Sequence, residues 1–192
     1  MRGPKDDLHS YLAAAREAVL WKLDGLSEYD KRRPLTPTGT NLLGLVKHLT
    51  GCEAGYFGGA FGRPFPRELP WLTDDEPNPD LWARPEESSE VITGLYREAC
   101  AHADGTIHAL DLDSVGHIPQ WGDDRSTVTL HRILVHMIAE THRHAGHADI
   151  VRELVDGAVG MRPGRGNLPD AGARWWARYR DRVERAAREA LP

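Results

Sequence analysis

The chain has 192 residues, of which 40% are hydrophobic and 28% are charged, and its formal net charge is −5. This length suits a single domain, residues 1–192, with enough volume for a real core. The hydrophobic content excludes a disordered chain. An acidic balance also argues against a nucleic-acid partner, which would require a basic face.

The compartment is inferred from segments that the sequence lacks. No stretch approaches the roughly 18 apolar residues of a membrane span, so we expect no membrane partner. Residues 1–7 lack the apolar centre of a secretory signal, which makes the cytoplasm the default location. Cys52 and Cys100 are then expected to be reduced thiols rather than a disulfide.

The first predicted element is an amphipathic helix over residues 7–26, where apolar residues recur at steps of three and four. The polar stretch of residues 27–40 follows, and Pro34 and Pro37 exclude a helix interior from it. We therefore expect a turn-rich connection there.

A second helix is predicted to begin at Thr40 or Asn41, because either side chain can accept a hydrogen bond from an early backbone N–H. It runs to about Tyr56 and ends in a glycine-rich and proline-rich segment. Residues 63–85 form a long irregular connection, and a loop of this length is usually functional or packed on the domain. Its tryptophans favour packing on the bundle.

A third helix is predicted over residues 85–110, with Glu86 and Glu87 near its positive N-terminal end. Residues 111–126 form a second loop, partly extended. The most regular pattern predicts a fourth helix over residues 129–156, closed by Gly157.

A last helix, rich in arginine and tryptophan, is predicted over residues 173–190. Four long helices with intervening loops indicate an all-α protein, a four-helix bundle with an additional C-terminal helix. Periodicity alone does not give the order in which the helices pack.

Histidines concentrate on the fourth predicted helix, where five of them fall between positions 131 and 147. Steps of three or four residues keep side chains on one helical face, and His136, Glu140, His144 and His147 follow this rule. Glu140 and His144 are one turn apart, which is the spacing by which a helix presents two metal ligands. His142 points about 200° away from Glu140 and should lie outside the group.

A third metal ligand must come from another element, because a catalytic zinc-type site normally has three protein ligands and an open position. His48, between apolar residues of the second helix, is the candidate. His147 can substitute for Glu140, because it also neighbours His144. The competing interpretation is that His48 is an ordinary core histidine and that the fourth-helix group is a solvated face.

Other side chains allow two interpretations each. Trp71, Trp82 and Trp121 can wall a pocket or pack loops on the bundle, and packing is favoured. Arg143 and Arg152 can receive a substrate carboxylate or lie exposed, and exposure is favoured. Asp149 can orient a histidine or pair with a neighbouring arginine.

Two segments together resemble a known family. Residues 140–150, read as ETHRHAGHADI, resemble the fourth-helix signature of DinB-like proteins, and residues 41–49, NLLGLVKHL, resemble the matching helix-two half. The likeness runs over roughly residues 8–156. More narrowly, it resembles the actinobacterial DinB-related branch of unknown function, which is similar to the mycothiol-dependent maleylpyruvate isomerase at its metal site.

The resemblance implies an up-down-down-up four-helix bundle with one divalent metal held by His48, Glu140 and His144. Many family members have histidine at both helix-four positions, whereas Glu140 stands at the first position here. A set of two histidines and one carboxylate accepts zinc, nickel, iron or manganese, so the metal stays open.

The resemblance also implies that the metal activates a small thiol, with mycothiol as the candidate, for attack on a small electrophile. The leading hypothesis is therefore a metal-dependent thiol S-transferase or isomerase with a small-molecule substrate. A metal-dependent hydrolase with His147 or His136 as base is one alternative. A non-catalytic homodimer that binds metal or ligand in a stress response is another. The sequence identifies no catalytic residue.

Overall fold

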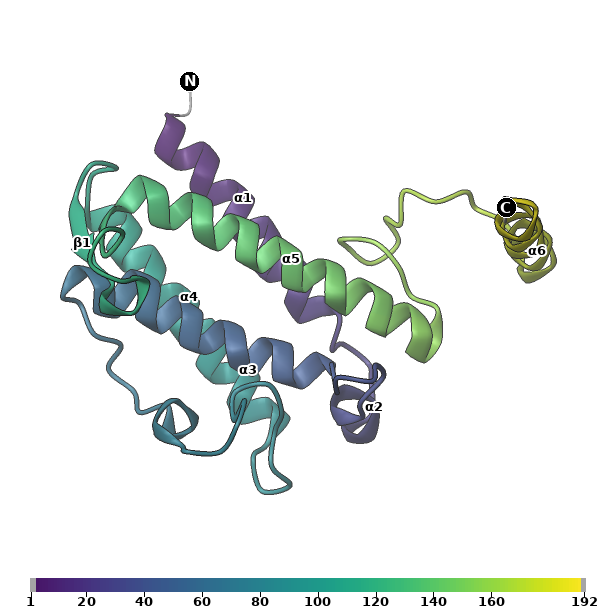
Figure 1. The fold of residues 1–192 in the computed structure, drawn as a ribbon, viewed down its shortest axis with the longest axis horizontal. Helices are drawn as coiled ribbons and strands as arrows, with labels where there is room; N and C mark the ends of the chain where they lie inside the picture. Colours follow the sequence, from purple (N-terminus) through teal and green to yellow (C-terminus); the bar gives the residue numbers. More distant parts are fainter. Residues whose placement is uncertain (1–2, 191–192) are drawn as a thin grey trace.

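Helix α1, Pro4–Trp21, opens the bundle in a computed structural model that describes residues 3–190 (Figure 1). The predicted helix was placed five residues too far at its C-terminal end. The chain leaves the helix through a turn in which Gly25 has a φ of 73°, a conformation that favours glycine. Carbonyls of this turn bond to Arg152 instead of continuing the helical ladder.

A short helix α2, Glu28–Arg32, lies in the connection predicted to be a turn. The Ser27 hydroxyl accepts a hydrogen bond from the backbone N–H of Asp30 and caps it. Five residues are too few to show a helical repeat of hydrophobicity, which is why the pattern gave no indication of this helix.

Helix α3, Leu42–Glu53, continues through a π-helical turn, Ala54–Gly58, and a 3-10 turn, Gly59–Phe61. Of the two predicted caps, Asn41 is the one used, because its Oδ1 accepts from the N–H of Gly44 at 2.8 Å. The predicted glycine-rich end is confirmed, and Gly62 closes it in the left-handed conformation.

Helix α4, Ser89–Ala109, begins four residues later than predicted because Ser88 caps it. Glu86 and Glu87 therefore precede the helix, and Glu87 forms an ion pair with Lys47 instead. The long loop before α4 includes a 3-10 turn, Pro70–Thr73, and lies on the bundle as predicted, with Trp71 only 6% exposed.

Two short antiparallel strands, β1 (Val115–His117) and β2 (Thr127–Thr129), confirm that the second loop is partly extended. A 3-10 turn, Pro119–Trp121, lies between them. Helix α5, Leu130–Asp156, follows directly, capped by Thr129 and closed by Gly157 at a φ of 79°.

The helices form an up-down-down-up bundle, as the resemblance implied. Helices α1 and α5 run in one direction and α3 and α4 in the other (Figure 1). One buried cluster joins α1, α3, α4 and the C-terminal half of α5, and a second joins the other end of the bundle with the strands. In the described part of the chain, no helix is long and apolar enough to cross a membrane.

The last helix, α6 (Ala173–Glu189), confirms the predicted C-terminal helix but stands apart from the bundle (Figure 1). None of its residues is buried, and none belongs to a hydrophobic core cluster. The two larger buried clusters involve only the part of the chain from α1 to α5, and the assignment of residues 1–192 to one domain stays a prediction.

Candidate metal centre

The structure brings His48 of α3 together with Glu140 and His144 of α5, and we call these three residues the histidine cluster. Nε2 of His144 lies 3.0 Å from Oε1 of Glu140, and Nε2 of His48 lies 3.6 Å from the same oxygen. One donor atom from each residue lies within 4.8 Å of the others. The helical spacing of Glu140 and His144 and the packing of α3 on α5 create this arrangement.

The donor spacing fits one divalent ion. Metal–ligand distances of about 2.0–2.2 Å at tetrahedral angles place neighbouring donors about 3.3–3.6 Å apart. The side chains of His48, Glu140 and His144 are 24%, 25% and 13% exposed, so solvent or substrate can reach the cluster. The three residues therefore suit a site with an open coordination position.

Electrostatics favour the metal-binding forms of two of the donors, Glu140 and His144. Burial raises the pKa of Glu140, but hydrogen bonds from His144 and His48 and their charges outweigh burial and hold it below its ordinary value. Burial and nearby His48 lower the pKa of His144, although Glu140 opposes this shift. An ionised carboxylate and neutral imidazoles are the ligand states that a metal requires.

Asp80 is a functional candidate that the sequence did not reveal. Its Oδ2 lies 2.7 Å from Nδ1 of His48, which leaves Nε2 of that ring directed at Glu140. A carboxylate in this position fixes the tautomer and orientation of a ligating histidine. Asp80 is thus suited to hold the His48 ring in the orientation that directs Nε2 at Glu140.

Three contacts with α3 and its cap fix the position of the loop that carries Asp80. Nδ2 of Asn41 donates to the carbonyl of Leu81 at 3.0 Å, and Nζ of Lys47 donates to the carbonyl of Trp82 at 3.0 Å. The Leu81 carbonyl also lies so close to Gly44 that any side chain there would collide with it. A glycine inside a helix is the only sequence signal of this approach.

Cys52 lies one helical turn after His48, with Sγ 3.5 Å from its Nε2. It is not part of the three-donor group. Burial raises the pKa of the Cys52 thiol to about 12, and the charge of Glu140 adds to the shift. Both Cys52 and Cys100 are free, in agreement with the predicted reduced thiols.

A cavity of about 450 Å³ opens beside the cluster, and His48 and Asp80 form part of its wall. Tyr56 and Trp121 form an aromatic side, with ring centroids 5.7 Å apart. Trp121 also packs against the second buried cluster, so this residue both packs, as favoured, and lines a cavity, which was the other interpretation.

His136 belongs to the same aromatic group, with its ring 4.8 Å from Tyr56 and 4.9 Å from Trp121. Burial lowers the pKa of His136, and the charge of Glu140 only partly offsets this. His136 is thus a neutral imidazole one turn before Glu140.

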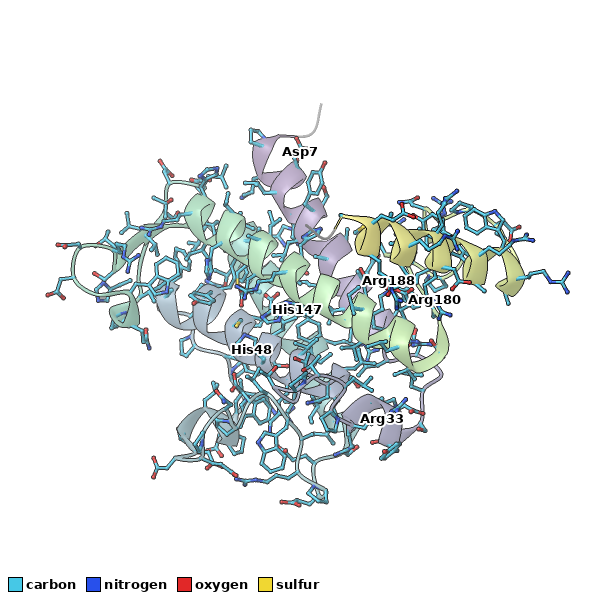
Figure 2. All side chains as sticks on the ribbon, turned by 45° about the vertical axis from the view of Figure 1, so that its right-hand side comes forward. Asp7, Arg33, His48, His147, Arg180 and Arg188 are labelled. Atoms are coloured by element: carbon cyan, nitrogen blue, oxygen red, sulfur yellow. The ribbon has the colours of Figure 1, made fainter. Side chains whose placement is uncertain are left out.

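The remaining predicted histidines lie outside the donor group. His147 is exposed and contacts the far side of His144, with 3.4 Å between the two Nδ1 atoms. His142 hydrogen-bonds the carbonyl of Ile138. Figure 2 shows His48 and His147 on neighbouring helices in the middle of the bundle.

Arg152 is not an exposed residue, contrary to prediction, since it is 7% exposed. Its Nη1 donates to the carbonyls of Lys22 and Asp24, and Nε and Nη2 bind Asp156. It caps the C-terminus of α1, so it is not free for a substrate. Asp149 forms an ion pair with the buried Lys22 rather than orienting a histidine.

A second ionic group lies deeper in the bundle, and we call Arg16, Glu53 and Asp104 the arginine cluster. Arg16 donates to both carboxylate oxygens of Glu53 at 2.7 Å and to Asp104 at 2.6 Å. Glu53 is fully buried. This cluster joins α1, α3 and α4.

Comparison with known proteins gives one family. The family model described as Mycothiol-S-transferase matches residues 7–157, which run from α1 to the end of α5 and leave out α6. No curated protein and no solved structure matches the chain significantly.

Proposed function

The chain belongs to the mycothiol-S-transferase family, a DinB-like family, and from this premise we propose that it is a metal-dependent thiol S-transferase or isomerase. Mycothiol is the proposed thiol, and a small electrophile is the proposed substrate. The observation that carries the proposal is the convergence of His48, Glu140 and His144 beside an open cavity.

The proposed metal ligands are His48, Glu140 and His144, which suit zinc, nickel, iron or manganese. A bound divalent ion supplies a Lewis acid that deprotonates a coordinating thiol. Asp80 holds the His48 ring in one tautomer, and the ionised Glu140 accepts from His144. These contacts fix the donor geometry before any ligand arrives.

The cavity provides the place for the electrophile. Its walls combine the aromatic Tyr56 and Trp121 with Leu72 and Ile118, so they remove water from an apolar substrate body. In the transfer, a sulfur–carbon bond forms and the bond from carbon to the leaving group breaks with its electron pair. The thiol proton passes to solvent.

The test is turnover of mycothiol with a panel of alkyl halides, epoxides and unsaturated carbonyl compounds, followed by mass spectrometry of the conjugate. Protein stripped of metal and reloaded with each of the four metals should show metal-dependent conjugation. His48→Ala should lose it, whereas His131→Ala, which changes an exposed histidine of α5, should keep it. Equal rates with and without metal would refute the proposal, and turnover without thiol would indicate a hydrolase.

A further inference from the structure

Helix α6 presents an apolar face that nothing in its own bundle covers. At 100° per residue, its apolar side chains fall within an arc of about 120°. Trp175, Tyr179 and Val183 on this face are 37%, 40% and 51% exposed. The face is completed by three smaller or less exposed residues: Trp176, Ala186 and Ala187. A contiguous exposed stripe of this kind marks an interaction surface.

Helix α6 lies apart from the bundle, at the end of a connection whose first residues are bound to α1. Nζ of the buried Lys22 donates to the carbonyl of Gly160, which fastens the start of the connection to the end of α1. Within residues 3–190, no hydrogen bond or ion pair joins a side chain of α6 to the bundle. Figure 2 shows α6, with Arg180 and Arg188 labelled, as a separate rod, and Figure 1 shows it away from the bundle.

The two halves of α6 differ in size of side chain. Trp175, Trp176 and Tyr179 fill the apolar face of the first half, and their rings contact one another at 4.7–5.7 Å. Ala186 and Ala187 form the face of the second half. Two such helices in antiparallel orientation place large rings over small side chains, which is the complementarity that packed helices need.

The charged residues are also distributed unequally between the two halves of α6. The first half carries three arginines and no acid, whereas the second half is neutral, because its three acids balance the other three arginines of α6: Arg182, Arg185 and Arg188. Antiparallel pairing brings the arginine-only half of one helix beside the acid-bearing half of the other. Parallel pairing would instead set three arginines against the same three arginines.

We propose that α6 pairs antiparallel with α6 of a second copy of this chain and forms a two-fold homodimer through its aromatic and alanine face. A lipid surface is the less suited occupant. With six arginines and three acids, α6 has a charge of +3, so the rest of the chain carries −8 and is repelled by anionic lipid. The alanine half also offers little apolar surface for insertion.

A contact of this length lies at the low end of specific interfaces, so the dimer should dissociate on dilution. Light scattering of the full chain across a wide concentration range should give a mass that rises toward twice 21.4 kDa. Val183→Glu should raise the dissociation constant at least about tenfold, since it places a charge in the centre of the face. Ala177→Glu makes a matched change on the opposite face and should leave it unchanged.

The orientation is tested by cross-linking in a Cys52→Ser, Cys100→Ser background. A mixture of Ala173→Cys and Ala190→Cys chains should oxidise mainly to the mixed disulfide, because antiparallel helices bring opposite ends together. Disulfides mainly between identical chains would refute the antiparallel arrangement. A wild type that stays monomeric, or a dimer that survives Val183→Glu, would refute the interface. Monomers that sediment with phosphatidylglycerol vesicles would assign the face to lipid instead.

Discussion

The arginine cluster and the histidine cluster are both built from ionisable side chains and both include a residue of α3, yet only the arginine cluster satisfies all of its hydrogen-bonding groups internally. Arg16 has donors and no lone pair, and both Glu53 oxygens and Asp104 take up those donors. In the histidine cluster, imidazole and carboxylate lone pairs converge on one point beside a cavity. The difference separates an ionic group that holds the fold from one that can bind.

The two clusters also differ in how deeply their side chains are buried. The side chains of Arg16 and Glu53 are 6% and 0% exposed, whereas those of His48 and Glu140 are 24% and 25% exposed. A fully buried pair must satisfy itself, because water cannot. A partly exposed group can keep lone pairs without a protein partner at little loss of folding free energy, because water can bond to them. A binding site requires such lone pairs. The experiments below separate these two roles.

The largest effect should come from breaking the arginine cluster. Arg16→Met leaves the Glu53 carboxylate buried without its partner, which should lower the free energy of unfolding by about 3–5 kcal/mol. Urea denaturation measures this loss. The double variant Arg16→Met, Glu53→Leu should recover most of it, because both charges are gone. A loss of under about 1 kcal/mol in the single variant would contradict the structural role.

Removing a ligand from the histidine cluster should weaken metal binding strongly and change the free energy of unfolding little, which is the opposite of the arginine cluster. His48→Ala or His144→Ala should weaken zinc binding by more than about 100-fold, beyond the cost of losing an outer-shell partner. The unfolding free energy of the metal-free protein should change by less than about 1 kcal/mol, since neither ring is in the core. Metal content by mass spectrometry measures the first effect, with His131→Ala as the control. Full zinc occupancy in His144→Ala would show that His144 is not a metal ligand.

Asp80 should show an intermediate effect. Asp80→Asn keeps the shape of the side chain but loses the charge that orients His48, so zinc affinity should fall about 10–100-fold. Competition with a chelator measures the affinity. Asp75→Asn, in the same loop but exposed, should bind zinc like the wild type. Equal affinities for the two variants would show that the contact between Asp80 and His48 does not matter for binding.

The bundle and the three donors could be predicted because both depend on local spacing. The period of apolar residues predicted α1, α3, α4 and α5, and the step from Glu140 to His144 predicted that these two residues share a face. His48 was found through its place on an apolar face and through the family resemblance. Errors at helix ends arose where a cap such as Ser88, or a tertiary contact such as that of Arg152, sets the boundary.

The contact of Asp80 with His48 and the arginine cluster could not be predicted, because loop packing and helix pairing bring these residues together. Asp80 is 32 residues from His48, and Glu53 is 37 residues from Arg16. No periodic signal connects positions so far apart. Arg152 was assigned to solvent for the same reason, since the carbonyls that it binds lie 128 to 131 residues away.

The smallest effect should be a difference in pH dependence between the two clusters. His144 has a folded-state pKa below its ordinary 6.5, because burial and His48 disfavour its charge, so the unfolded chain binds its proton more readily. The metal-free protein should therefore lose stability as the pH falls below about 6.5, and His144→Gln should lose less. Asp104 has a pKa below its ordinary 3.8, because hydrogen bonds and charge from Arg16 outweigh burial. Its contribution is present above about pH 3.8 and fades only as the pH falls further, so Asp104→Asn should flatten the curve there. Urea midpoints across this pH range measure both effects, and a loss of stability below about pH 6.5 that is as large in His144→Gln as in the wild type would contradict the assignment to His144.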